Sequence, residues 1–462
     1  MQLTSIWPKI LYRLFFLLLA LAALVQARGL FFIDQGDFNR VAWYFLEKPL
    51  DENHRIWQFK DVFEKLRFDI PSLVFGISAY IQKLYWLEYN LAFSAVLGQL
   101  LMLVYAHLLS RNVAELADLG MAGRTALLLI FSVSFFYSHN IAMLNSLYSE
   151  YVFMLAMPLF VLGLISLQKT GGSGSGHIFI LLSGFFMGMA KTQYFYIPAL
   201  IALTFFVLAW IDKRKINHMF ATALLIIQIV CFIPLEKNDF AQLNYYHSLY
   251  FGSYTVLSEP ELSALKISLE SRLCIGTDAW GNKMSGTKGE RVEGGRKTCY
   301  KNQEFQILDV LRPYILFPFT LVKMIRYSEA HWGTVQYFHV YPNSYYLKSL
   351  LQPMDSQNIL VRLSLIRDGI FDGFILIIMA LLGIASVFWR RIDSFVRYAS
   401  FFLGTFFLSQ LLVSIVGEGM RDLGKHMWAA QFSMDLMLAL WLAMVVKKAF
   451  QRPLPGEKAK LQ

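Results

Sequence analysis

Nine polar side chains, each near the end of an apolar segment, are of the types that group-transfer reactions use. The carboxylates suited to accepting a proton from a hydroxyl group are Asp34, Asp37 and Glu150. The groups suited to binding a phosphate or the substrate around it are Lys191, Gln193, Arg421, Asp422, Lys425 and His426. A phosphate leaving group needs cations to stabilise it, and an acceptor hydroxyl needs a base. We therefore predict that the three acids act in catalysis and that the second set binds a donor phosphate or substrate.

Each of these groups also has a structural interpretation, which the sequence leaves open. Asp34 and Asp37 are suited to capping a helix or to a solvated turn. Glu150 is suited to the first turn of a helix, where the helix dipole favours a negative charge. Lys191 is suited to extending its ammonium group to the membrane surface. The turn 421–426 is suited to an ion-pair network of little energetic weight.

The composition indicates a membrane protein. Of the 462 residues, 56% are hydrophobic and 16% are charged, whereas soluble domains contain about 25% charged residues. A membrane-spanning helix needs about 20 mostly apolar residues. Segments of this kind, which we predict to be ten spans, are 11–32, 89–110, 124–140, 151–168, 177–193, 194–211, 218–235, 369–389, 398–416 and 427–446.

Two further apolar features need an interpretation. The segment 11–32 is not followed by a small-residue cleavage site, so we expect a retained helix rather than a cleaved signal peptide. The segment 72–87 is apolar but short, and Lys83 interrupts it. We therefore predict that this segment is a helix lying in the membrane surface rather than a span.

Lysine and arginine residues determine the expected orientation. They gather at both ends of the chain and in the connections after every second span, at Lys9, Arg13, Arg111, Arg124, Lys169, 212–215, 390–397 and from Lys447 onward. The positive-inside rule then places both termini in the cytoplasm. The same topology places the nine polar side chains at the outer boundary of the membrane, where ionisable groups usually mark a site. Because these connections explain the net charge of +10, we expect no nucleic-acid partner.

The predicted topology divides the chain into three regions. Residues 1–235 form a module of about seven spans, which includes a first outer loop at 33–88 and its interfacial helix. Residues 236–368 form a large extracytoplasmic loop region between the seventh and eighth spans. Residues 369–462 contain the last three spans and a basic cytoplasmic tail.

The three cysteines of the chain lie in different surroundings. Cys231 lies in an apolar segment, which predicts a small buried residue. Cys274 and Cys299 share the large polar loop. In an extracytoplasmic loop they would either form a disulfide or remain two thiols, and the sequence leaves both alternatives open.

Four motifs in chain order resemble a known family. They are "NSLYSE" (145–150), "AKTQ" (190–193), "NYYHSLYFG" (244–252) and "GEGMRDLGKHMWAAQFSMDL" (417–436). Together with an acidic pair in the first outer loop and a polytopic body with a cytoplasmic N-terminus, they resemble the GT-C superfamily of integral-membrane glycosyltransferases. More narrowly, the motifs look like those of bacterial hexosyltransferases of S-layer-type surface-glycan assembly.

The resemblance implies a GT-C-like fold and a sugar donor linked to polyprenyl phosphate. It also implies that Asp34 or Asp37 matches the acidic motif of the superfamily, whose carboxylate often serves as the catalytic base. Two residues separate the acids here, whereas an Asp-x-Asp motif has one. The role of a metal ion and the identity of the base therefore stay open.

The sequence thus predicts an all-α integral membrane hexosyltransferase in the bacterial cytoplasmic (inner) membrane, with its active site on the extracytoplasmic side. It would move a hexose from a polyprenyl-phosphate sugar to a lipid-linked or cell-surface glycan acceptor. The expected partners are membrane lipid, the donor and the acceptor, and a divalent cation is the one cofactor left open. Two alternatives remain. A surface-glycan polymerase or ligase would use Arg and His in the late loop, and a glycan or lipid transporter would carry ionisable residues near the bilayer midplane.

Overall fold

A computed structural model gives the fold of the chain. It describes residues 6–28, 30, 38–51, 54–61, 70–172, 174–213, 218–232, 241–281, 299–300, 304–329, 358–371, 373–421 and 423–450. Asp34, Asp37 and Asp422 lie outside these described residues.

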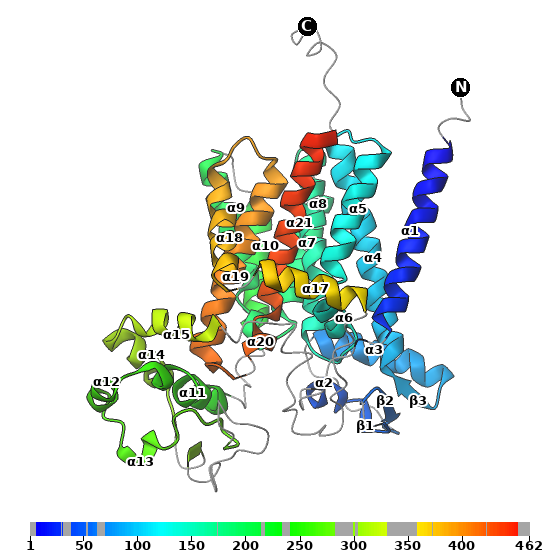
Figure 1. Cartoon of the computed structure of the whole chain (residues 1–462). Coiled ribbons are helices and arrows are strands. Elements are labelled where there is room, and N and C mark those ends of the chain that lie inside the picture. The colour runs from blue at the N-terminus through cyan, green and yellow to red at the C-terminus, as the bar shows by residue number, and fades with distance from the viewer. Residues whose placement is uncertain are drawn as a thin grey trace.

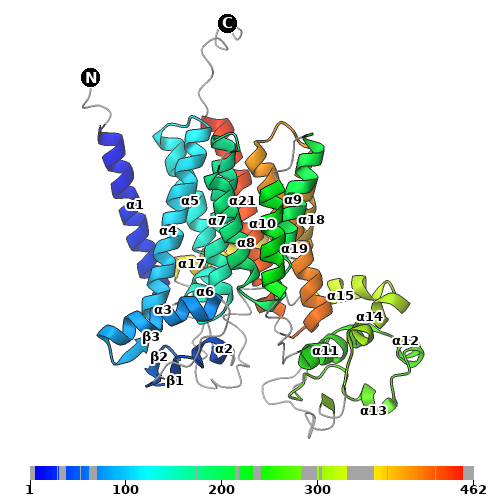
Figure 2. The same cartoon turned by 180° about the vertical axis from the view of Figure 1, so that it is seen from behind.

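Ten apolar helices form a bundle (Figures 1 and 2). They are α1 (Ile6–Ala27), α4 (Leu91–Leu116), α5 (Met121–Phe135), α7 (Glu150–Lys169), α8 (Ser175–Gly188), α9 (Ile197–Ile211), α10 (His218–Phe232), α18 (Gly373–Ala385), α19 (Ser394–Glu418) and α21 (Trp428–Phe450). Each overlaps one of the ten predicted segments. Within the most apolar stretch of each helix, 78% of α7 is buried but only 17% of α1. The core of the bundle therefore surrounds α7, and α1 presents most of its surface outward.

The predicted number of ten spans is not confirmed. Among the described residues, six helices are long and apolar enough to cross a membrane, or up to eight if each of two bent helix pairs counts as one span. In the first pair α5 meets α6 (Ser138–Leu144) at 66°, and in the second α17 (Ile359–Ile370) meets α18 at 78°. The 14 residues of α8 extend only about 21 Å at 1.5 Å per residue, which is less than the ~30 Å hydrocarbon core.

Both terminal helices reach the same end of the bundle, since α1 begins and α21 ends there (Figure 1). The opposite end carries α6, α20 (Leu423–His426) and the segments predicted to lie outside the membrane. This arrangement agrees with the prediction that the two termini lie on one side. We call the end with α6 and α20 the loop end.

The predicted first outer loop contains a small sheet, which the prediction of an all-α fold did not include. Strands β1 (Leu46–Pro49), β2 (Ile56–Phe59) and β3 (Glu88–Asn90) pair antiparallel in the order β1-β2-β3. The short helix α2 (Asn39–Ala42) precedes β1. Strands of three or four residues are too short for an alternating hydrophobic pattern to be recognised in the sequence.

Helix α3 (Ile70–Tyr85) occupies the segment predicted to be interfacial. It crosses the loop end of the bundle (Figure 1). Phe75, Ala79 and Gln82 are buried against the protein, whereas Ile77 and Leu84 are more than half exposed. An apolar face turned away from the protein is typical of a helix lying in a membrane surface.

The large loop folds as a subdomain with its own core. Its helices are α11 (Ala241–Tyr250), α12 (Glu259–Ala264), α13 (Leu269–Arg272), α14 (Ile307–Leu316) and α15 (Thr320–Ser328). Tyr246, Leu249, Tyr250 and Leu262 belong to the buried cluster between them. A disulfide joins Cys274 to Cys299, which answers the question that the sequence left open.

The subdomain meets the end of α19 through backbone atoms. The N–H of Met420 donates to the carbonyl of Phe251 at 2.9 Å. Gly419 has a φ of +62°, and a Cβ atom there would lie 2.7 Å from the His247 carbonyl oxygen and 2.8 Å from Gly252 Cα. Both the left-handed conformation and the close approach therefore require glycine at position 419.

We predict that Gly419→Ala weakens this junction. The added methyl group collides with backbone, and the left-handed conformation adds strain of about 1–3 kcal/mol. The midpoint of thermal unfolding in detergent should fall. Gly417→Ala is the matched control, because nothing lies within 4 Å of a Cβ atom at that position. Equal melting behaviour of the two variants would contradict the assignment.

We also predict that removing the disulfide loosens the subdomain. Loss of a native disulfide typically costs about 2–5 kcal/mol, so Cys274→Ser/Cys299→Ser should speed tryptic cleavage of the large loop several-fold. Cys231→Ser serves as the control, because Cys231 is a free buried thiol. Mass spectrometry under non-reducing conditions should recover the two linked peptides, and two free thiols would refute the pairing.

Candidate functional site

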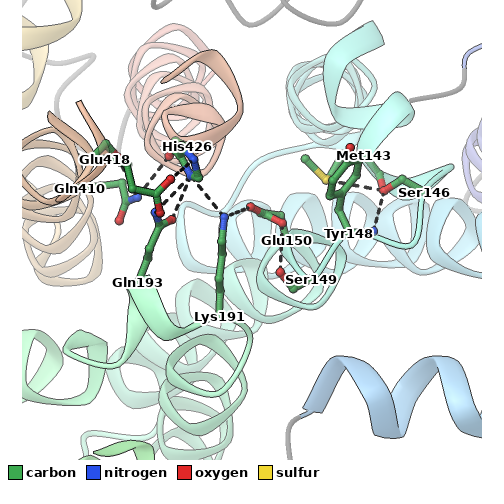
Figure 3. A network of polar contacts seen from close by, with 11 residues as sticks. Met143, Ser146, Tyr148, Ser149, Glu150, Lys191, Gln193, Gln410, Glu418 and His426 are labelled. Carbon is green, nitrogen blue, oxygen red and sulfur yellow. Dashed lines mark hydrogen bonds and ion pairs between the residues drawn. The ribbon is translucent and has the colours of Figure 1, made fainter. Parts of the chain in front are cut away.

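The ends of four helices at the loop end of the bundle bring a set of polar side chains together (Figure 3). Glu150 begins α7, Glu418 ends α19, and His426 ends α20. Lys191 lies between α8 and the single turn η2 (Thr192–Tyr194), which also carries Gln193. The sequence is apolar within these helices and polar where they end. The fold therefore gathers the polar ends into one layer, which we call the polar cluster.

Lys191 lies at the centre of the polar cluster (Figure 3). Its Nζ atom lies 2.8 Å from Glu150 Oε1 and 3.3 Å from His426 Nδ1. The side chain of Lys191 is 10% exposed and that of Glu150 is 1% exposed. An ion pair withdrawn this far from water is costly to break, because removal of one partner leaves the other charge buried and uncompensated.

Glu418 and Gln193 hold His426 from the other side. His426 Nε2 lies 2.5 Å from Glu418 Oε2, and Gln193 Nε2 donates to Glu418 Oε1 at 2.7 Å. With a proton on Nε2, Nδ1 is left as an acceptor that faces both the Gln193 amide nitrogen, at 3.1 Å, and the Lys191 ammonium group. Burial lowers the pKa of His426, and Lys191 acts in the same direction against the opposing effect of Glu418. We therefore assign a neutral imidazole that donates to Glu418 and accepts from Lys191.

The ammonium group of Lys425 lies against the aromatic ring of Tyr148. Its Nζ atom lies 5.6 Å from the centroid of Tyr148, within the range of a cation–π contact. The Tyr148 ring also packs edge-on against Phe38, with 5.1 Å between centroids. Lys425 is 4% exposed, so its charge acts in a region with little water.

Asp34 and Asp37 belong to a segment whose two described ends contact this region. On one side, the amide of Asn145 donates to the carbonyl oxygens of Ala27 and Leu30. On the other side, Phe38 packs against Tyr148. Asn145 and Tyr148 lie in the same loop, just before Glu150. The chain therefore leaves α1 and returns to α2 beside the polar cluster.

Arg421 lies apart from Lys191, in contact with the large-loop subdomain. Its Nη1 atom pairs with Asp278 Oδ2 at 3.0 Å, and its guanidinium carbon lies 5.2 Å from the Trp280 ring. Helix α20 begins only at Leu423, so Arg421 belongs to the turn that precedes it.

A second set of buried polar residues lies deeper in the bundle. Arg367 of α17 donates to Asp435 Oδ1 at 2.8 Å and to Gln431 Oε1 at 2.8 Å. His139 Nε2 lies 3.5 Å from Asp435 Oδ2. The described partners of Asp435 are therefore Arg367 and His139. Sequence reasoning missed Arg367, because an arginine just before an apolar segment looks like an ordinary basic flank.

Among the described residues, no group of three or more His, Cys, Asp or Glu side chains is arranged to hold a metal ion. Asp34, Asp37 and Asp422 lie outside that set, so the divalent cation stays an open prediction. The described side chains can instead supply a buried ammonium group, a neutral imidazole and two carboxylates. Such a set can bind an anion and exchange protons with a hydroxyl group.

Two comparisons with known proteins bear on the family. The sequence model of the family described as "YfdI N-terminal transmembrane domain" matches residues 14–460. The chain is also 30% identical over 332 residues to the Escherichia coli (strain K12) "Uncharacterized protein YfdI", and the alignment covers 68% of each chain. The family model thus covers nearly the whole chain, from within α1 to beyond α21. The chain therefore belongs to the family of the YfdI N-terminal transmembrane domain, and it is a membrane protein.

Proposed function

We propose that the protein is a membrane glycosyltransferase of GT-C type. It moves a hexose from a polyprenyl-phosphate sugar to a lipid-linked or cell-surface glycan. The observation that carries this proposal is the polar cluster around Lys191, which lies at the end of the bundle where the chain departs toward Asp34 and Asp37. Cations for a phosphate and carboxylates for a hydroxyl group thus belong to one region.

Lys191 is suited to the donor phosphate. An ammonium group has three donor positions, and the described contacts of Lys191 use two of them, to Glu150 and to His426. The third is available for a phosphate oxygen. Because His426 is neutral in our assignment, it orients the ammonium group without repelling it, and Glu150 supplies the balancing negative charge.

The acceptor hydroxyl needs a base, and Asp34 or Asp37 fills this role in the proposal. Phe38 is bonded directly to Asp37 and packs on Tyr148, whose ring also faces Lys425. Consecutive Cα atoms are about 3.8 Å apart. The contact of Phe38 with Tyr148 therefore supports the proposal that the Asp37 carboxylate lies within reach of the polar cluster. Glu150 is already engaged with Lys191, so it serves better as a positioning group than as the base.

The orientation belongs to the proposal as well, with both termini in the cytoplasm and the loop end outside the bacterial inner membrane. A disulfide at the loop end supports this side assignment, because disulfides persist in oxidising compartments. The opposite end carries the basic connections, among them Arg111, Lys169 and Lys447. The positive-inside rule supports a cytoplasmic location for that end.

A transporter is the second candidate, and one observation favours it. Both bent helix pairs contribute to the deeper polar set, α6 through His139 and α17 through Arg367. Broken helices around buried charges are common in transporter sites. Flux of a labelled lipid-linked sugar across proteoliposomes without transfer would favour this candidate. A polymerase or ligase would instead join acceptor units without consuming a polyprenyl-phosphate hexose.

We predict that the Glu150–Lys191 pair is needed for hexose transfer itself, in addition to stabilising the protein. Lys191→Gln alone strands a buried carboxylate and should destabilise the protein by about 3–5 kcal/mol. Lys191→Gln/Glu150→Gln removes both charges and should restore the melting temperature. Transfer of radiolabelled hexose from polyprenyl phosphate should stay about 100-fold below wild type, as expected when a phosphate-stabilising donor is lost. Recovery of transfer in the double variant would reduce the pair to a structural element.

We predict that Asp34→Asn/Asp37→Asn abolishes transfer while expression and melting temperature stay normal. Without a carboxylate, no strong base of this segment remains to deprotonate the acceptor hydroxyl. Asp118→Asn is the control, because Asp118 is exposed at the opposite end and its positive φ of 50° also suits asparagine. The assay uses membranes from a strain lacking the gene as the source of acceptor. Undiminished transfer in the double variant would rule out this pair as the base.

A further inference from the structure

A pocket of about 260 Å³ lies among α2, β1 and β2, in the segment that follows Asp37 in the chain. Three elements of the first outer loop line it, namely the start and end of α2, the strand β1 and the end of β2. The lining residues are Asn39, Trp43, Leu46, Glu47, Trp57 and Lys60. This volume lies just below the roughly 300–1,000 Å³ range of ligand pockets, so it suits a ligand of one or two rings.

Two tryptophans line the pocket, one exposed and one buried. Trp43 is 64% exposed, whereas Trp57 is 2% exposed. The Trp57 indole N–H donates to the His54 carbonyl oxygen at 2.8 Å, so Trp57 supports the pocket and Trp43 is the ring with surface to offer a ligand. An exposed tryptophan presents a large rigid surface at low entropic cost.

The polar lining groups carry one charge of each sign. Glu47 supplies a carboxylate that accepts hydrogen bonds from hydroxyl groups, and Lys60 supplies an ammonium group that donates to them. Asn39 adds an amide that does both. Because the two charges balance, the lining favours a neutral polyhydroxyl ligand over a phosphate or another ion. An exposed aromatic ring with hydrogen-bond donors and acceptors beside it is the chemistry that recognises a sugar ring.

The pocket is built on an ordered scaffold. Asp51 Oδ1 accepts hydrogen bonds from the N–H groups of Arg55 and Ile56, each at 2.7 Å, which fixes the turn between β1 and β2. Phe45 and Tyr89 are buried behind the sheet. The sheet lies on the far side of α3 from the bundle in both views (Figures 1 and 2). Helix α2 and strand β1, which flank Trp43 in the chain, therefore lie beyond α3 as seen from the bundle.

From these observations we propose that the pocket binds a sugar residue of the acceptor glycan, an inference that rests on the proposed glycosyl transfer. Asn39 follows Phe38, and Phe38 packs on Tyr148, which faces Lys425 of the site. A glycan held in the pocket thus lies along the first outer loop beside the polar cluster. Trp43 and Glu47 are specificity-determining residues of this subsite.

The test measures binding and transfer separately, on full-length protein in nanodiscs. The probe is the oligosaccharide released by mild acid from the envelope glycan of a strain lacking the gene. Trp43→Ala should raise the Kd for this probe at least tenfold, and Glu47→Gln should raise it several-fold. The control Trp389→Ala removes an exposed tryptophan near the opposite end, next to the turn Ser386–Phe388, and should leave the Kd within twofold. In the transfer assay Trp43→Ala should raise the KM for acceptor and leave the KM for the polyprenyl-phosphate donor unchanged.

The possible results distinguish failure of the pocket proposal from failure of the proposed glycosyl transfer. Transfer with normal acceptor KM in Trp43→Ala would keep the transferase and overturn the pocket. Probe binding that depends on Trp43, without transfer from any donor, would uphold a sugar site in the pocket and overturn the transferase. Quenching of Trp43 fluorescence by brominated lipid, with no protection by the oligosaccharide, would overturn the proposal by showing that Trp43 is a membrane anchor.

Discussion

The packing of the loop end depends on one ammonium group, that of Lys191, which is buried away from water. The buried charge is stabilised because Glu150 and His426 lie within contact distance. Glu150 begins α7 and His426 ends α20, whereas Lys191 follows α8. The contacts of Lys191 therefore join α7 and α20 to the connection after α8. Glu418 then continues the same chain of contacts to α19. A single buried charge thus sets the relative positions of four helix ends.

Polar groups also account for the irregular helices. Helix α5 stops at Phe135 and α6 resumes at Ser138 with a sharp change of direction, and the N–H of Ser138 donates to the hydroxyl of Ser364 in α17 at 2.7 Å. Arg367, three residues later in α17, is neutralised by Asp435 of α21. The two bent pairs are therefore tied to each other and to α21 by side chains that a straight helix would expose to lipid. In a membrane, interruptions of a helix persist only where such partners exist.

The sequence was informative about those features that depend on residue type alone. The ten apolar segments each contain a helix, and Glu150, Lys191, Gln193 and His426 meet as predicted because a topology derived from charge already placed them at one depth. The break at Phe136 could not be foreseen, since neither proline nor glycine interrupts the segment there. The contacts of Arg421 with Asp278 and of Arg367 with Asp435 join residues more than 60 positions apart, and no local pattern encodes such pairs.

The junction at Gly419 has a mechanical consequence. The backbone of residues 247–252 touches the backbone of residues 419–420 with no side chain between them. Contacts of this kind have no flexible layer to absorb a displacement. Glu418, which holds His426, is the adjacent residue. A displacement of the subdomain would therefore reach the backbone next to Glu418 without a flexible side chain to absorb it.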